Sequence, residues 1–163
     1  MKYLKAILIA TAIFITVCFQ SPPVSAQTTI YAKFIIRDAK VNQVDITKQW
    51  VTDSAYLVIY TIKDDKNIYF ASVNPKQKSQ SYGAISKLKV STESATEDNY
   101  ENETFNFNWS YSNSYNDKVG TSAIKLLKIM KEGGIEFSCT IVTEGLDIMV
   151  YRGYMEGSLK NLE

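Results

Sequence analysis

The amino-acid sequence predicts an all-β fold, an antiparallel meander of about eight strands that closes into a small barrel. Tyr, Val, Ile, Thr and Phe, which favour strands, are plentiful. Apolar and polar side chains alternate with a period of two in several segments, and turn residues interrupt them at short intervals. Closure is expected because it removes the exposed edges of a meander. A β-sandwich is the alternative.

Residues 1–26 have the pattern of a cleavable export signal. Lys2 and Lys5 form a positive start, residues 6–19 are uncharged and largely apolar, and two prolines follow. Small or modest side chains at 24–26 then suit cleavage by a signal peptidase. The apolar run is shorter than the roughly 20 residues that a membrane span needs. The sequence therefore predicts export, with cleavage after residue 26.

The predicted mature chain, residues 27–163, has the size of a single β domain. Export would place it in the periplasm or outside the cell, with no membrane span after cleavage. A lipoprotein anchored at Cys18 is the alternative. Of 18 basic side chains, Lys2 and Lys5 leave with the signal, so 16 remain against 17 acidic ones. Such a nearly neutral chain has no overall positive electrostatic potential that would attract nucleic acid.

The chain contains no histidine, and after the predicted cleavage Cys139 is its single cysteine. The commonest general base and metal ligand is therefore missing, and no intramolecular disulfide can form. Cys139 lies in a segment with alternating apolar residues, as a small buried hydrophobe does. We therefore expect no enzyme, no metal and no cofactor. An enzyme that uses two carboxylates is the alternative.

The mature chain is expected to begin with a strand at 30–37. Its alternation places four apolar side chains on one face: Ile30, Ala32, Phe34 and Ile36. Residues 41–50 are polar and irregular, and we interpret them as a loop or a single helical turn that ends at Trp50.

A hairpin follows. Residues 55–63 form an almost continuous apolar run, which is typical of a strand covered on both sides. A turn at 64–67 leads into a second strand at 68–73. Residues 74–83 are polar and contain a proline, which predicts a loop, and the next strand is expected at 84–91.

Residues 92–103 carry several acidic side chains and no basic one, so we expect a mobile stretch. The clearest strand of the sequence follows at 105–112, where aromatic and polar residues alternate without exception. A loop is expected at 113–120.

The C-terminal part predicts three more strands. Residues 121–130 also fit a helical face, but their β neighbours favour a strand. A glycine-containing turn is expected at 131–134. Residues 135–154 form a hairpin around a turn at 144–147, and residues 157–163 are expected to be a frayed tail.

The export signal, the eight alternating segments and their meander order resemble the small lipocalin-like barrels of exported bacterial proteins. The resemblance spans roughly residues 28–156 and implies a barrel fold. The lipocalin hallmark, a glycine two residues before a tryptophan, is absent, because Lys48 precedes Trp50 and Phe107 precedes Trp109 at that spacing.

The most prominent candidate for ligand binding is the aromatic face of the strand at 105–112. Its members are Phe105, Phe107, Trp109 and Tyr111. Such a face is either the core side of an amphipathic strand or the wall of a ligand cavity, because both point the same way. Tyr82 and Tyr115 are further candidates, since both fall in expected loops, and loops at a barrel mouth often carry function.

Two functions are therefore expected, in order of preference. The first is an exported module that holds a small apolar or aromatic ligand or displays a binding mouth. The second is a structural or interaction protein with a filled core that meets another protein or a glycan through its loops at 74–83 and 113–119. The triplet Asp53-Ser54-Ala55 also resembles a bacterial O-glycosylation acceptor.

Overall fold

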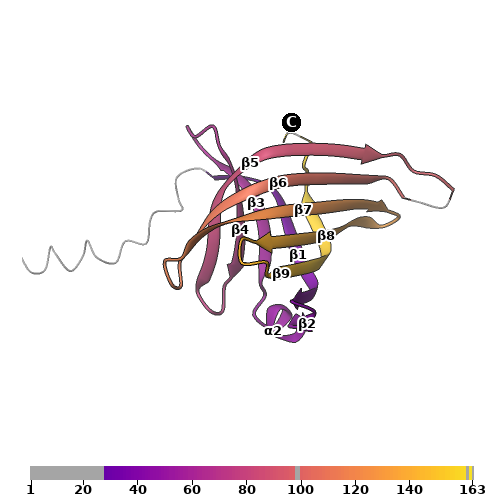
Figure 1. Cartoon of the computed structure of the whole chain (residues 1–163). Helices are drawn as coiled ribbons and strands as arrows, with labels where there is room; N and C mark the ends of the chain where they lie inside the picture. The colour runs from indigo at the N-terminus through magenta and orange to yellow at the C-terminus, as the bar shows by residue number, and fades with distance from the viewer. Residues whose placement is uncertain (1–27, 98–99, 161, 163) are drawn as a thin grey trace, which may run out of the picture.

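The computed structural model describes residues 28–97, 100–160 and 162. The predicted export signal and its cleavage site lie outside these described residues. Within them, nine strands form one antiparallel sheet and a short helix is inserted after the second strand (Figure 1). The elements are β1 (Thr28–Val41), β2 (Val44–Asp45), α2 (Thr47–Thr52), β3 (Tyr56–Ile62), β4 (Ile68–Asn74), β5 (Ser79–Glu93), β6 (Asn102–Asn113), β7 (Val119–Lys131), β8 (Gly134–Thr143) and β9 (Ile148–Gly157).

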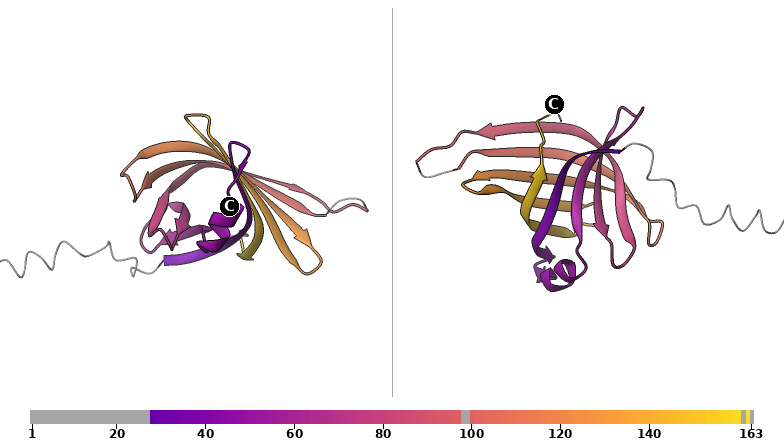
Figure 2. Two further views of the ribbon diagram at one scale, coloured as in Figure 1. Left: turned by 90° about the horizontal axis from the view of Figure 1, so that it is seen from below. Right: turned by 180° about the vertical axis from the view of Figure 1, so that it is seen from behind.

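The sheet closes into an eight-stranded barrel because β1 pairs with β3 on one side and with β9 on the other. Strands β3 to β9 follow each other as a meander, and the two-residue β2 folds back onto the end of β1. Figure 2 shows the sheet curling until β9 lies beside β1. The predicted all-β closed meander is thus confirmed, and this eight-stranded antiparallel barrel is consistent with the architecture that the resemblance implies.

The interior of the barrel is filled by side chains in mutual contact. Phe70 is fully buried and meets Phe107 and Trp109 edge to face, with ring centroids 5.8 and 5.1 Å apart. Phe34 and Phe137 meet at 5.1 Å. Such edge-to-face pairs are favourable arrangements of aromatic rings. Cys139 is buried in the same cluster, and burial raises the pKa of its thiol, which agrees with its predicted role as a small hydrophobe.

Strand β1 corrects the predicted apolar face at its start. Ala32, Phe34 and Ile36 are buried as expected, but Ile30 is 61% exposed. The pairing of β1 with β3 shifts register between Ile30 and Ala32. A bulge inserts one extra residue, so the side chains before it point to the opposite face of the sheet. A prediction based on a strict period of two misses this reversal.

The predicted loop at 74–83 is wrong in its second half, because β5 already begins at Ser79 and a turn occupies 75–78. Likewise, β5 and β6 extend into the acidic stretch predicted at 92–103. They leave a connection at 94–101, of which residues 98 and 99 are not described. Both errors arose because strand ends beyond the packed core lack the apolar alternation that marks a strand.

The predicted frayed tail is also wrong where the structure describes it, at residues 157–160 and 162. The backbone N–H of Ser158 donates to the carbonyl of Tyr31, and the side chains of Leu159 and Leu162 are 1% and 3% exposed. Both leucines belong to the core cluster. The tail leaves β9 at the end of the barrel opposite α2, so it seals that end with apolar side chains.

Candidate functional site

The candidate site is the end of the barrel beside helix α2, which we call the α2 mouth. A pocket of about 160 Å³ lies there between α2 and the adjoining ends of β4, β5 and β6. Its lining is uncharged and consists of amides, serines and one indole: Gln49, Trp50, Ser72, Asn74, Gln77, Ser79, Gln80, Ser81 and Asn113. Three segments far apart in the sequence, 49–50, 72–81 and 113, therefore meet around this pocket.

Helix α2 contributes the aromatic side chain of the pocket. The predicted helical turn is present, although it extends two residues beyond Trp50, to Thr52. The Trp50 ring packs on the buried ring of Tyr151 from β9, with centroids 4.7 Å apart and an angle of 42° between the planes. The indole is therefore fixed by the core on one side while it lines the pocket on another.

Hydrogen bonds fix the polar lining opposite the helix. The Asn113 side-chain amide donates to the Ser81 hydroxyl oxygen at 2.9 Å, and its carbonyl oxygen accepts the backbone N–H of Tyr115 at 2.8 Å. Because the Ser81 oxygen acts here as an acceptor, its own hydrogen is free to donate to another group. These two hydrogen bonds thus fix the orientation of the Asn113 amide in the pocket lining.

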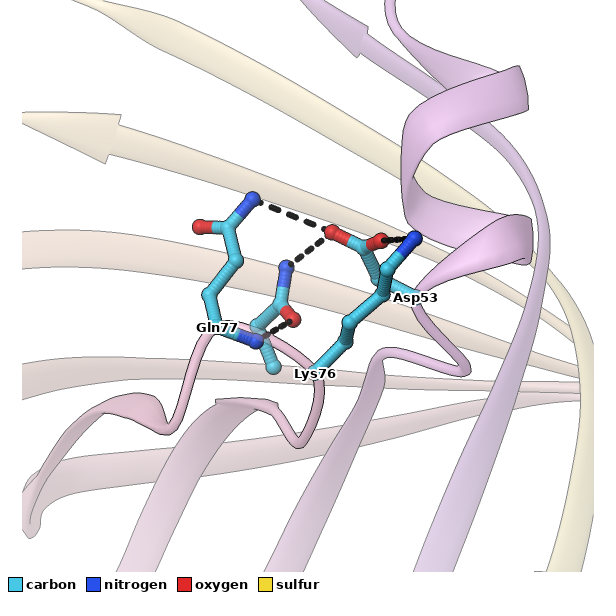
Figure 3. A network of polar contacts seen from close by, with 4 residues as sticks. Asp53, Lys76 and Gln77 are labelled. Carbon is cyan, nitrogen blue, oxygen red and sulfur yellow. Dashed lines mark hydrogen bonds and ion pairs between the residues drawn. The ribbon is translucent and has the colours of Figure 1, made fainter.

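A buried carboxylate ties α2 to the neighbouring turn (Figure 3). One oxygen of Asp53, which is 6% exposed, accepts the side-chain amides of Asn74 and Gln77, each at 3.0 Å. The other oxygen lies 3.3 Å from the ammonium of Lys76. The Asn74 hydrogen bond, followed by the contributions of Lys76 and Gln77, outweighs burial and holds the Asp53 pKa below its ordinary value. This network places the two amides that line the pocket.

We expect the Asp53 network to make the stability of the protein depend on pH in the acid range. A carboxyl whose pKa is lowered on folding stabilises the fold fully above its unfolded pKa of about 3.9, and this stabilisation is lost as the pH falls toward the folded pKa. Replacing Asp53 with Asn should therefore flatten the fall of the melting temperature below about pH 4. Melting curves followed by circular dichroism between pH 2 and 7 would measure this.

The matched control is Asp64→Asn. Asp64 is exposed, and its side chain makes no hydrogen bond or ion pair with the described residues. Its φ of 68° suits asparagine. The control should keep the pH profile of the unmodified protein. An Asp53→Asn profile that also matches the unmodified protein would show that this network does not stabilise the fold.

The structure places the predicted aromatic stripe inside the barrel, in the packed core. Phe105, Phe107 and Trp109 are each 3% exposed. Tyr111 is half-buried, and its ring lies 4.7 Å from that of Trp109 and over Gly120. None of the four lines the pocket of the α2 mouth. The indole N–H of Trp109 has no hydrogen-bond partner in the described structure, and neither does the hydroxyl of Ser122 opposite it.

The two tyrosines predicted in loops lie apart from the stripe. Tyr82 belongs to β5, not to a loop, and it alternates with the inward-facing positions of that strand. Tyr115 is in the turn between β6 and β7 and is 82% exposed. No ring contact joins them to each other or to the stripe within the described residues. Whether any of these six aromatic residues binds a ligand stays a prediction.

The sequence did not point to the α2 mouth. The one available signal was that Ser72 and Asn74, and then Ser79 and Ser81, repeat at a spacing of two residues, as inward positions of strands do. In the glycosylation triplet, the Asp53 side chain is buried in its network while Ser54 is exposed at a φ of 54°. Modification of Ser54 stays a prediction.

Comparison of the chain with protein-family models, with curated proteins and with solved structures found no match. Among the described residues, no three His, Cys, Asp or Glu side chains come together in a way that would hold a metal ion. No helix in the described part of the chain has the length and apolar character to cross a membrane.

Proposed function

We propose that this protein is an exported recognition module that binds a small, uncharged, hydroxyl-rich ligand at the α2 mouth. A terminal sugar residue of a glycan has this chemistry. The observation that carries the proposal is the lining of the pocket, where amides and hydroxyls held by hydrogen bonds surround one aromatic ring. Amides both donate and accept hydrogen bonds, as sugar hydroxyls do, and an indole packs against the C–H face of a sugar ring.

The dimensions of the pocket favour a single ring. A volume of about 160 Å³ equals roughly five water molecules at about 30 Å³ each, well below the range of about 300 to 1,000 Å³ for drug-sized ligands. The packed aromatic core supports binding at the mouth over binding in the interior. The lining also lacks a titratable side chain for acid–base catalysis, which supports binding without turnover.

Binding of the purified mature chain to an array of neutral glycans tests the proposal. Trp50→Phe keeps an aromatic ring on Tyr151 but shortens the surface offered to the ligand, and Gln49→Ala removes an exposed amide of the lining. We expect each to weaken binding at least tenfold, which corresponds to about 1.4 kcal/mol.

Thr52→Ala is the control, because Thr52 is exposed on the same helix but does not line the pocket. It should leave the affinity unchanged. If the array captures nothing, or if a captured glycan binds Trp50→Phe and Gln49→Ala as tightly as the unmodified protein, the proposed function is wrong. A tightly held apolar molecule found by native mass spectrometry would point to the barrel interior.

A further inference from the structure

The outer face of the barrel carries a second depression, on the surface of β5 to β8 and away from the α2 mouth. Its volume is about 330 Å³. The exposed side chains around it include three lysines, which we call the lysine groove: Lys87, Lys89 and Lys125. The other outward side chains are small or polar, namely Asn106, Asn108, Ala123, Thr140 and Val142.

Strand register brings the lysines together from distant parts of the sequence. Asn106 pairs with Lys89 on one side and with Lys125 on the other, so the two lysines flank it in one row across three strands. Neighbouring strands lie about 4.8 Å apart, which puts the two lysine backbones roughly 10 Å from each other. Ammonium groups spread along such a row can contact successive anionic groups of one polymer chain.

Lys87 lies two residues before Lys89 on β5, outside this row, and has a strained backbone. Its φ is 54°, and the pairing of β5 with β6 shifts register between Ser86 and Lys89. A lysine in this conformation costs roughly 1 to 2 kcal/mol, which glycine would avoid. Bulges commonly re-aim a side chain beside functional surfaces. Here the bulge adds a third cation to the outer face of β5.

The charge of the groove is uncompensated. The ion pairs of the described residues involve Lys76, Lys128, Lys131 and Arg152, and none involves a lysine of the groove. No acidic residue lines the depression. The amides of Asn106 and Asn108 and the hydroxyl of Thr140 add hydrogen-bond donors, so the groove presents positive charge and donors on a chain that is nearly neutral as a whole.

We propose that the lysine groove binds an anionic polysaccharide through sulfate, phosphate or carboxylate groups repeated along its chain. Lysine ammonium groups and amide donors are suited to such oxyanions. The lining offers no exposed aromatic ring for stacking bases, since Phe107 points into the core, and this disfavours single-stranded nucleic acid. The site is independent of the α2 mouth and does not rest on the function proposed there.

Dextran sulfate, with neutral dextran as the matched polymer, tests this inference on the full mature chain. We expect much tighter binding to dextran sulfate than to dextran, and this excess should weaken as salt rises because exposed charges are screened. The triple variant Lys87→Gln, Lys89→Gln, Lys125→Gln should bind at least tenfold more weakly. A control triple variant at exposed lysines elsewhere, Lys48→Gln, Lys66→Gln and Lys160→Gln, changes the net charge equally and should stay within about twofold.

A fourth variant separates recognition from folding. Lys87→Gly removes the ammonium and relieves the strain, so it should weaken binding while keeping or raising the melting temperature. Equal losses in the two triple variants would reduce the interaction to net charge and overturn the proposal, as would unchanged binding of the groove variant. Tighter binding to phosphatidylglycerol vesicles or to single-stranded DNA than to dextran sulfate would also overturn it.

Discussion

Replacing Gly83 with alanine is expected to destabilise the barrel more than any other single methyl group added to β5. A β-carbon on Gly83 would lie 1.8 Å from the carbonyl oxygen of Ser110 and 2.9 Å from the Cα of Tyr111. Both are backbone atoms of β6, so they cannot rotate away as a side chain would. The two strands would have to separate by about 1 Å. Glycine within a strand often marks such a close approach of another backbone.

We expect Gly83→Ala to lower the free energy of unfolding by roughly 3 to 5 kcal/mol. This is a large loss, because the free energy of unfolding of a typical domain is only about 5 to 15 kcal/mol. Urea unfolding followed by circular dichroism would measure this loss. The control is Gly145→Ala in the turn between β8 and β9, where a β-carbon would meet nothing closer than the Thr143 hydroxyl oxygen, at 3.8 Å. Equal stabilities of the two variants would contradict the close approach of β5 and β6.

Gly83 also lies in a part of β5 that the sequence did not predict as a strand. Alternation identified β6 and β8 well, because Phe105, Phe107, Phe137 and Cys139 all face the packed core. It failed at Ser79–Gly83, where the inward residues of β5 are serines at the mouth and a glycine against β6. A strand whose inner face meets a polar pocket has no apolar period, so its composition resembles that of a loop.

The candidate site was harder to foresee than the fold. The alternation in the sequence correctly predicts that the aromatic stripe faces inward. A core and a cavity wall have the same pattern, however, so only the contacts of Phe70 with Phe107 and Trp109 show that the stripe is packed. The α2 mouth and the lysine groove each depend on strand register. Lys89 and Lys125, for example, become neighbours through Asn106 alone. Amides and lysines have no spacing signature comparable to that of a metal or nucleotide site.

The second large effect is expected at the C-terminal tail, because the sealed end of the barrel depends on it. Leu159 and Leu162 are nearly fully buried in the core cluster, although they follow the last strand. Truncating a buried leucine to alanine costs about 2 to 5 kcal/mol. The double variant Leu159→Ala, Leu162→Ala should therefore unfold at a much lower urea concentration. Without urea, its circular dichroism signal from β-strands should be retained, because β9 and its pairing with β1 end before Ser158.

Lys160→Ala, an exposed change between the two leucines, should leave stability within about 0.5 kcal/mol of the unmodified protein. The double variant should also bind a dye that reports exposed apolar surface, since the end opposite α2 would open. A double variant as stable as Lys160→Ala would mean that the tail does not close the barrel. The interior would then be accessible from that end, and the preference for the α2 mouth as the binding site would rest on the packed aromatic core and the pocket lining alone.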